Sequence, residues 1–172
     1  MMRGVLLGRA GIDVVVLEKH GDFFRDFRGD TVHPSTLQVM DELGLIDSFL
    51  KLPHQQLQKL DGVIGGKPVR IADLGRLDIE YPFIAFMPQW EFLDFLAREA
   101  ARFPNFRLIM GARATTLIAQ NERITGLHVD GPNGELVIRC ALVVGADGRN
   151  SIVRGKAGPA GDSFGPPTQG LW

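Results

Sequence analysis

The sequence predicts an α/β fold of the Rossmann-like type, in which a parallel sheet is combined with an antiparallel β meander and a small β insertion. Residues 12–18 form a nearly continuous β-branched run after a helical segment at residues 3–10, which is typical of a strand buried on both faces of a parallel sheet. Residues 88–103 carry apolar side chains on one broad helical face. The apolar run at residues 142–144 leads to an Asp-Gly turn at residues 147–148, as a strand of an open α/β sheet leads to a loop.

The composition is that of one ordinary globular domain. The chain has 172 residues, of which 45% are hydrophobic and 23% are charged. Its 19 Lys and Arg residues against 20 Asp and Glu residues give a net charge of −1, which does not favour a nucleic-acid partner. No apolar run approaches the roughly 18 residues that a membrane span needs. The single cysteine fits a reducing compartment, so we expect a cytoplasmic protein.

No catalytic side-chain arrangement stands out. The four histidines are scattered, and neither a metal-ligand spacing nor a Ser/His/Asp arrangement is evident. We therefore expect no metal site and no catalytic side chain, and if the chain is part of an enzyme, a bound cofactor carries the chemistry.

The N-terminal segment reads as the middle of a βαβ unit. Residues 3–10 form a helix that ends at Gly11, and the buried parallel strand at residues 12–18 follows. The first strand of that unit is missing, so we expect the chain to begin late relative to a complete domain. Glu18 ends the strand, where an acidic residue of a dinucleotide-binding unit accepts hydrogen bonds from ribose hydroxyls. A solvated carboxylate is the equally weighted alternative.

The next segments offer two further candidates. Arg28, before Gly29, has the paired donors that a phosphate accepts, although a surface salt bridge is the simpler explanation. Ser35 is predicted to cap a helix that has an apolar stripe, with Gln38 completing a capping box. The amide of Gln89, at the start of the helix at residues 88–103, could meet a ligand near the helix N-terminus. Simple solvation of this side chain is the stronger reading from position alone.

The remaining segments are predicted to be mainly β. A hairpin around Gly65-Gly66 belongs to a β insertion at about residues 57–86. Strands are predicted at residues 106–110, 114–119, 124–129 and 135–144, the last three as a meander. Asp147-Gly148 forms either a tight turn alone or a ligand contact, because glycine permits close approach and a carboxylate accepts hydrogen bonds from hydroxyls.

Together these residues resemble the FAD-binding region of the class A flavoprotein monooxygenases, the para-hydroxybenzoate and phenol hydroxylase-like aromatic hydroxylases. The resemblance covers nearly the whole chain in order. It is carried by residues 11–18, by Arg28-Gly29 with residues 33–35, by Gln89, and most specifically by residues 145–154, Gly-Ala-Asp-Gly-Arg-Asn-Ser-Ile-Val-Arg. The implied fold is a partial Rossmann-like FAD-binding domain of the glutathione-reductase type.

The resemblance implies an enzyme that uses FAD, NAD(P)H and O₂ to hydroxylate an aromatic or polyketide-like substrate through a flavin C4a-hydroperoxide. It places Glu18 at the adenosine ribose, and Arg28 and Gln89 along the pyrophosphate and ribityl region. It places Asp147 and Gly148 where both FAD and the nicotinamide cofactor pass. The full cofactor-binding set that it implies is Glu18, Lys19, Arg28, Gln89, Asp147, Gly148 and Arg154.

The resemblance also implies a truncated domain. Residues 1–154 are expected to be an incomplete FAD-binding domain, which lacks the Gly-x-Gly-x-x-Gly loop and the later ribityl-binding motif. Residues 155–172 are expected to begin a substrate-binding domain. The alternatives are another FAD-dependent oxidoreductase of the same fold, or a non-catalytic remnant that binds no FAD. The expected partner is a small aromatic substrate, and a homodimer is left open.

Overall fold

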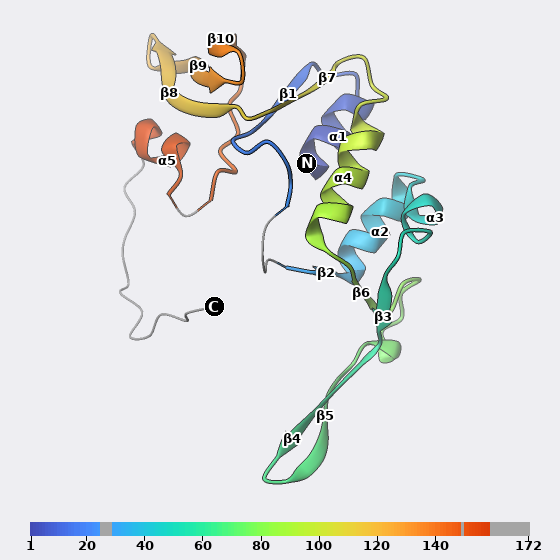
Figure 1. Ribbon diagram of the computed structural model, residues 1–172. Coiled ribbons are helices and arrows are strands. Elements are labelled where there is room, and N and C mark those ends of the chain that lie inside the picture. Colours follow the sequence, from blue (N-terminus) through green and yellow to red (C-terminus); the bar gives the residue numbers. More distant parts are fainter. Residues whose placement is uncertain (25–28, 149, 159–172) are drawn as a thin grey trace. The chain divides into compact units, whose positions relative to one another are not determined.

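The computed structural model of the 172-residue chain describes residues 1–24, 29–148 and 150–158 (Figure 1). These residues form two compact units. The first, here called the helical unit, contains residues 1–16 and 22–108. The second, here called the meander unit, contains residues 17–21 and the described residues from 109 onward. Each unit is described by itself.

Two parallel strands confirm the predicted parallel sheet, but the predicted burial of residues 12–18 on both faces is wrong, since Val15 is 42% exposed. These are β1 (Val14–Glu18) and β7 (Phe106–Met110), which are hydrogen-bonded neighbours. The amide of Val14 donates to the carbonyl of Asn105 at 2.9 Å, and the amide of Ala112 donates to the carbonyl of Glu18 at 2.8 Å. The residue numbers rise together along both strands, so the pair is parallel.

Helix α1 (Met2–Arg9) lies very close to these strands at Gly4. A Cβ at Gly4 would lie 2.8 Å from a ring carbon of Phe106 and 2.9 Å from a methyl group of Val16. Both distances are shorter than real Cβ contacts, so only glycine fits without a shift. Gly11, with φ +76°, ends the turn between α1 and β1, as predicted.

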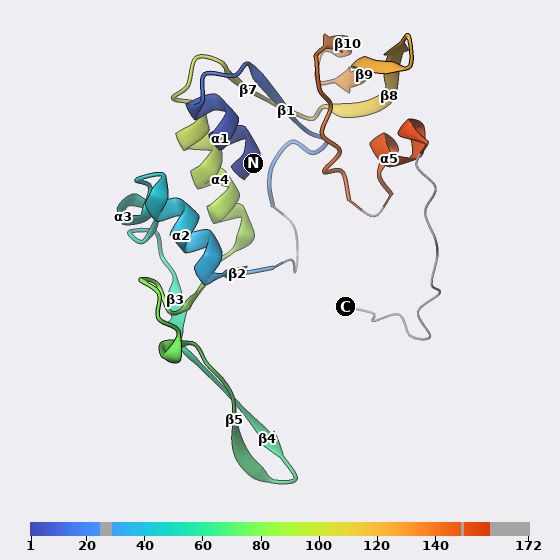
Figure 2. The same cartoon turned by 180° about the vertical axis from the view of Figure 1, so that it is seen from behind.

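The core of the helical unit lies among α1, α2 (Pro34–Glu42), α3 (Ile46–Phe49) and α4 (Gln89–Ala100). Helices α1 and α4 run side by side in both views of the molecule (Figures 1 and 2). Their apolar faces are buried together because this removes apolar surface from water. The largest fully buried side chains of this core are Val5, Leu37, Met40, Phe49 and Leu96.

The predicted cap of α2 is wrong by two residues. The helix begins at Pro34, and His33 is the N-cap residue without a side-chain cap hydrogen bond. Proline suits the first helical position, because its fixed φ is already helical and its missing N–H would have had no partner there. Gln38 does not complete a capping box with Ser35, and its side-chain amide donates instead to Glu42 at 3.3 Å.

A small antiparallel sheet supports the start of α4. Its order is β2 (Thr31–Val32), β6 (Ile84–Phe86) and β3 (Gln55–Leu57). Ala85 of β6 is fully buried in the core of the helical unit. Strand β6 therefore connects this sheet to the helices and delivers the chain directly to Gln89, the first residue of α4.

The predicted hairpin is confirmed. Strands β4 (Lys59–Ile64) and β5 (Lys67–Asp73) pair antiparallel across Gly65 and Gly66, whose φ values are +57° and +78°. Both turn residues are left-handed, which the favoured two-residue hairpin turn requires. Beyond β5 lies a short 3₁₀ turn at Leu74–Arg76. Both views show the hairpin extending away from the helices of its unit (Figures 1 and 2).

The meander unit is built on three antiparallel strands in the order β10-β9-β8. Their bounds are β8 (Arg113–Gln120), β9 (Arg123–Gly131) and β10 (Gly134–Arg139), close to the predicted strands. Ala112, Leu127 and Val129 form the buried core on this sheet.

The predicted strand at residues 135–144 is wrong in its second half. Strand β10 ends at Arg139, and the amide of Cys140 makes the last bond to the neighbouring segment, to the carbonyl of Thr125 at 3.1 Å. Residues 141–148 have no strand structure, and Leu142 is 76% exposed. An apolar run becomes a strand only where another strand takes up its backbone hydrogen bonds, and the described residues provide none here.

The close contact at Gly4 generates a stability prediction. Gly4→Ala should lower the free energy of unfolding by about 1–3 kcal/mol, because overpacking outweighs the better helix propensity of alanine. Gly155 offers a matched control, since it is also helical and a Cβ there meets nothing within 4 Å. Gly155→Ala should be neutral or stabilising in urea denaturation. Equal stability of the two variants would contradict the steric argument.

Candidate functional site

The Asp147 carboxylate is the centre of the most closely bonded polar cluster in the meander unit. Its Oδ2 accepts hydrogen bonds from the amides of Ile152 at 2.6 Å and Val153 at 3.3 Å. Its Oδ1 accepts a hydrogen bond from the hydroxyl of Ser151 at 2.6 Å. The amides belong to the first turn of α5 (Ile152–Ala157), so the carboxylate fastens the preceding loop to that helix.

Ser151 completes this arrangement. Its hydroxyl donates to Asp147, and its oxygen accepts from the amide of Arg154 at 3.0 Å, which makes it the N-cap of α5. Together the two side chains satisfy the three N–H groups at the start of the helix, which have no partner within it. A helix of six residues depends on such caps, since few internal hydrogen bonds hold it.

Two glycines shape the loop around Asp147. A Cβ at Gly145 would lie 2.8 Å from the Cβ of Val153, so the loop and α5 approach too closely for any side chain there. Gly148 has a φ of +83°, in the left-handed region that favours glycine. The structure therefore shows that Asp147 and Gly148 form a turn, which holds the Asp147 carboxylate against the first turn of α5.

The environment of Asp147 favours its charged form. Partial burial alone would raise the pKa of the carboxyl. The hydrogen bonds from Ser151 and from the amides of Asp147 itself, Val153 and Ile152 outweigh it, so the pKa is lowered. Ionised carboxylate oxygens only accept hydrogen bonds, and this is the chemistry that a ligand hydroxyl requires.

Glu18 lies at the end of β1, as predicted, and it also belongs to the meander unit. Its Oε1 accepts a hydrogen bond from the amide of His20 at 3.0 Å, and its carbonyl accepts from Ala112. Lys19, beside it, is exposed. The carboxylate thus closes a turn at the strand end, and carboxylate oxygens have the acceptor chemistry that suits a ribose hydroxyl.

The start of α4 forms a separate cluster in the helical unit. The amide of Gln89 donates to Oδ1 of Asp30 at 3.3 Å, and the carbonyl of Asp30 accepts from Met87 at 3.0 Å. The side-chain nitrogen of Gln89 lies 3.5 Å from where a Cβ on Gly29 would be, and Gly29 has a φ of +57°. Asp30 therefore caps α4 from a distance of 59 residues in sequence.

An aromatic contact lies beside this cluster. The rings of Phe24 and Trp90 have centroids 4.8 Å apart, so residues before and after the segment 25–28 both contact the first turn of α4. Arg28 itself lies outside the described residues. Gln89 belongs to the helical unit, whereas Glu18, Asp147 and the α5 residue Arg154 belong to the meander unit.

Two residues of these clusters were missed by sequence reasoning. Ser151 lies in the predicted motif, and a serine directly before the Ile-Val-Arg segment is an N-cap signal that could have found it. Asp30 gave no local signal, because it caps a helix distant in sequence. Within the described part of the chain no group of three or more His, Cys, Asp or Glu side chains could hold a metal ion. None of its helices is long and apolar enough to cross a membrane.

The cap around Asp147 predicts a characteristic pH response. A lowered pKa means that the cap keeps its contribution, about 1 kcal/mol, above the usual carboxyl pKa and loses it as the pH falls through the lowered value. In NMR titrations, the amide signals of Ile152 and Val153 should therefore hold their positions from pH 7 to about 4 and shift only below it. Ser151→Ala should move that transition to higher pH. A wild-type midpoint above the ordinary carboxyl range would contradict the cap.

Comparisons with known proteins identify the family to which this chain is related. The 6-methylpretetramide 4-monooxygenase of Streptomyces rimosus is 27% identical over 154 residues, which cover 90% of this chain and 37% of that protein. A rifampicin monooxygenase of Streptomyces venezuelae is 30% identical over 153 residues, which cover 87% of this chain and 30% of that protein. The chain thus spans only 37% and 30% of the lengths of these two relatives.

A solved structure agrees with them. The crystal structure of p-nitrophenol 4-monooxygenase from Pseudomonas putida matches with a TM-score of 0.79 and 26% identity, covering 90% of this chain and 40% of that one. The family model described as "FAD binding domain" matches residues 1–167. These matches confirm the fold and the resemblance that the sequence predicted. The chain therefore belongs to the FAD binding domain family, in the form carried by the class A flavoprotein monooxygenases.

Proposed function

We propose that this chain is the FAD-binding portion of a flavoprotein monooxygenase, which uses NAD(P)H and O₂ to hydroxylate an aromatic or polyketide-like substrate in the cytoplasm. The family match over residues 1–167 supports the cofactor. The named relatives support the reaction class, because they are called monooxygenases of 6-methylpretetramide, rifampicin and p-nitrophenol. The observation that carries the proposal is the Asp147 carboxylate, which hydrogen bonds from Ser151, Ile152 and Val153 hold in place as a charged acceptor.

The described residues fit the chemistry of FAD. The ribose and ribityl hydroxyls of FAD can donate hydrogen bonds to carboxylates, and its pyrophosphate accepts them. Glu18 and Asp147 supply carboxylate oxygens, while the side-chain amide of Gln89 supplies N–H donors. In our proposal Glu18, with Lys19 beside it, holds the adenosine ribose. Gln89 lies along the pyrophosphate and ribityl region.

The other predicted residues complete this assignment. Arg28 is proposed to pair with a phosphate, because a guanidinium offers parallel donors to phosphate oxygens. Asp147 and Gly148 are proposed to contact both FAD and the nicotinamide cofactor, since the left-handed glycine lets the backbone approach a ligand closely. Arg154 supports this turn through its amide, which donates to Ser151.

The work of this chain is binding and orientation. Bound FAD supplies the redox chemistry, since no amino-acid side chain can activate O₂ in this way. Asp147 remains charged at neutral pH, because its lowered pKa lies well below that range. It therefore acts as a hydrogen-bond acceptor for a hydroxyl and has no role as an acid.

A flavin titration tests cofactor binding by the chain. The 172-residue chain by itself should bind FAD at most weakly, so saturable quenching of flavin fluorescence is expected only at high chain concentration. Asp147→Asn should weaken this binding about tenfold further, as expected for loss of a charge-assisted hydrogen bond. Ser151→Ala is the matched control, because it loosens the same cap and keeps the carboxylate. It should bind FAD more tightly than Asp147→Asn does. Absence of saturable quenching would favour the remnant that binds no FAD, and equal weakening would leave Asp147 a cap only.

Stopped-flow kinetics tests the second contact of Asp147. In a full-length monooxygenase that contains this chain, Asp147→Ala should slow reduction of the flavin by NAD(P)H more than it weakens binding of the aromatic substrate. The physical reason is that the proposed hydrogen bonds go to the cofactors alone. The reverse ranking of the two effects would remove the role that we assign to Asp147.

A further inference from the structure

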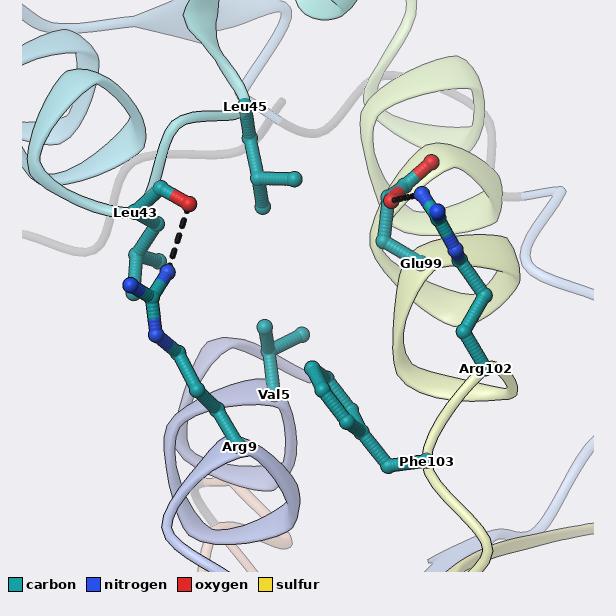
Figure 3. A pocket seen from close by; sticks show the side chains of 7 residues that line it. All are labelled: Val5, Arg9, Leu43, Leu45, Glu99, Arg102 and Phe103. Atoms are coloured by element: carbon teal, nitrogen blue, oxygen red, sulfur yellow. Dashed lines mark hydrogen bonds and ion pairs between the residues drawn. The ribbon is translucent and has the colours of Figure 1, made fainter.

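A pocket of about 340 Å³ lies within the helical unit, outside both polar clusters described above (Figure 3). It opens between the C-terminal ends of α1 and α4 and the segment that follows α2. This volume lies at the lower end of the range for small-molecule sites. The side chains that line it are Val5, Arg9, Leu43, Leu45, Glu99, Arg102 and Phe103.

One side of the pocket is apolar and firmly packed. Val5 is 1% exposed and belongs to the main core, and Phe103 packs against that core. Phe103 also lies directly over α1, since a Cβ at Gly8 would be 3.1 Å from its ring. Figure 3 shows the side chains of Val5, Phe103 and Leu45 pointing into the same space. A ring or a branched chain placed here would exchange water for apolar contacts.

A fixed positive charge lies at the edge of this apolar surface. Arg9 ends α1, and its Nη1 donates to the carbonyl of Leu43 at 2.6 Å (Figure 3). This bond restrains the guanidinium without neutralising it, because the acceptor is an uncharged carbonyl. No carboxylate of the described residues forms an ion pair with Arg9. Its other N–H groups therefore remain suited to a ligand anion.

Across the pocket a second arginine is already compensated. Arg102 forms an ion pair with Glu99 at 2.8 Å, and its side chain is 74% exposed. Arg9 lies in the last turn of α1, where the helix dipole favours cations, and Arg102 follows the C-cap residue of α4. The three charged side chains leave the pocket with one net positive charge, which Arg9 carries. The pocket therefore combines an apolar surface with one guanidinium that no carboxylate of the described residues pairs with.

We propose that this pocket binds a small organic carboxylate with an apolar ring or branched chain. The carboxylate would lie on the guanidinium of Arg9, where two parallel hydrogen bonds can form. The apolar body would lie against Val5, Leu45 and Phe103. An inorganic anion would gain only the first interaction and a neutral apolar molecule only the second. This site is separate from the residues that we assign to FAD.

Benzoate is a suitable probe, and benzamide is its uncharged counterpart of nearly the same shape. In NMR titrations of the full chain, benzoate should shift the methyl signals of Val5 and Leu45 saturably. Benzamide should bind at least about tenfold more weakly, because it cannot accept two charge-assisted hydrogen bonds from Arg9. This pair of ligands tests the proposal on the wild-type chain. Benzamide binding as tight as benzoate, or no saturable shift at either methyl group, would overturn it.

Matched variants test whether the guanidinium of Arg9 binds the carboxylate of benzoate. Arg9→Gln should weaken benzoate binding at least about tenfold, and Arg9→Lys should weaken it less, because lysine keeps the charge and loses the planar fork. Arg76→Gln is the control, since Arg76 is a cation of the same unit that does not line the pocket. It should leave benzoate binding unchanged. Unchanged benzoate binding in a folded Arg9→Gln variant would also overturn the proposal. The same variant should bind FAD as the wild-type chain does, so a failure of this proposal can be distinguished from a failure of the proposed function.

Discussion

The contact of α1 with the strand pair at Gly4 is the constraint on which the helical unit depends. Because Gly4 has no side chain, the helix lies directly on Val16 of β1 and Phe106 of β7. This places Val5 in the core and leaves the end of α1 facing α4 and the segment after α2. The same seating positions Arg9, one turn further along α1, at the edge of the pocket. The absence of a side chain at Gly4 therefore determines the position of Val5 in the core and of Arg9 at the edge of the pocket.

Regular elements could be predicted where local rules decide the structure. The hairpin turn followed from two glycines, and strand β7 followed from its apolar pattern with the residues as predicted. Prediction failed where the outcome depends on a partner distant in sequence. Residues 142–144 have a strand composition but no strand structure in the described residues, because strand structure requires a hydrogen-bonded neighbour. Similarly, no rule of local spacing could link Asp30 to the start of α4.

In the candidate site, too, the sequence predicted some features and left others to the structure. Sequence patterns located Glu18 at a strand end and Asp147 in a glycine-flanked turn, and the structure has both there. What the patterns could not supply was the hydrogen bonding of each carboxylate. The three bonds to Asp147 come from the N-cap residue Ser151 and from the first two residues of α5, so their geometry depends on how the loop folds back. These partners therefore become visible only in the structure.

The structural role of Asp147 affects how such motifs are interpreted in other genomes. Its carboxylate holds the first turn of α5, and Gly145 leaves no room for a side chain beside that helix. Purifying selection on folding alone would preserve Asp147 and Gly145. A gene that has lost its catalytic role would therefore keep these two residues for as long as its product must fold. Their persistence in a lineage reports the survival of the fold, and enzymatic competence has to be measured directly.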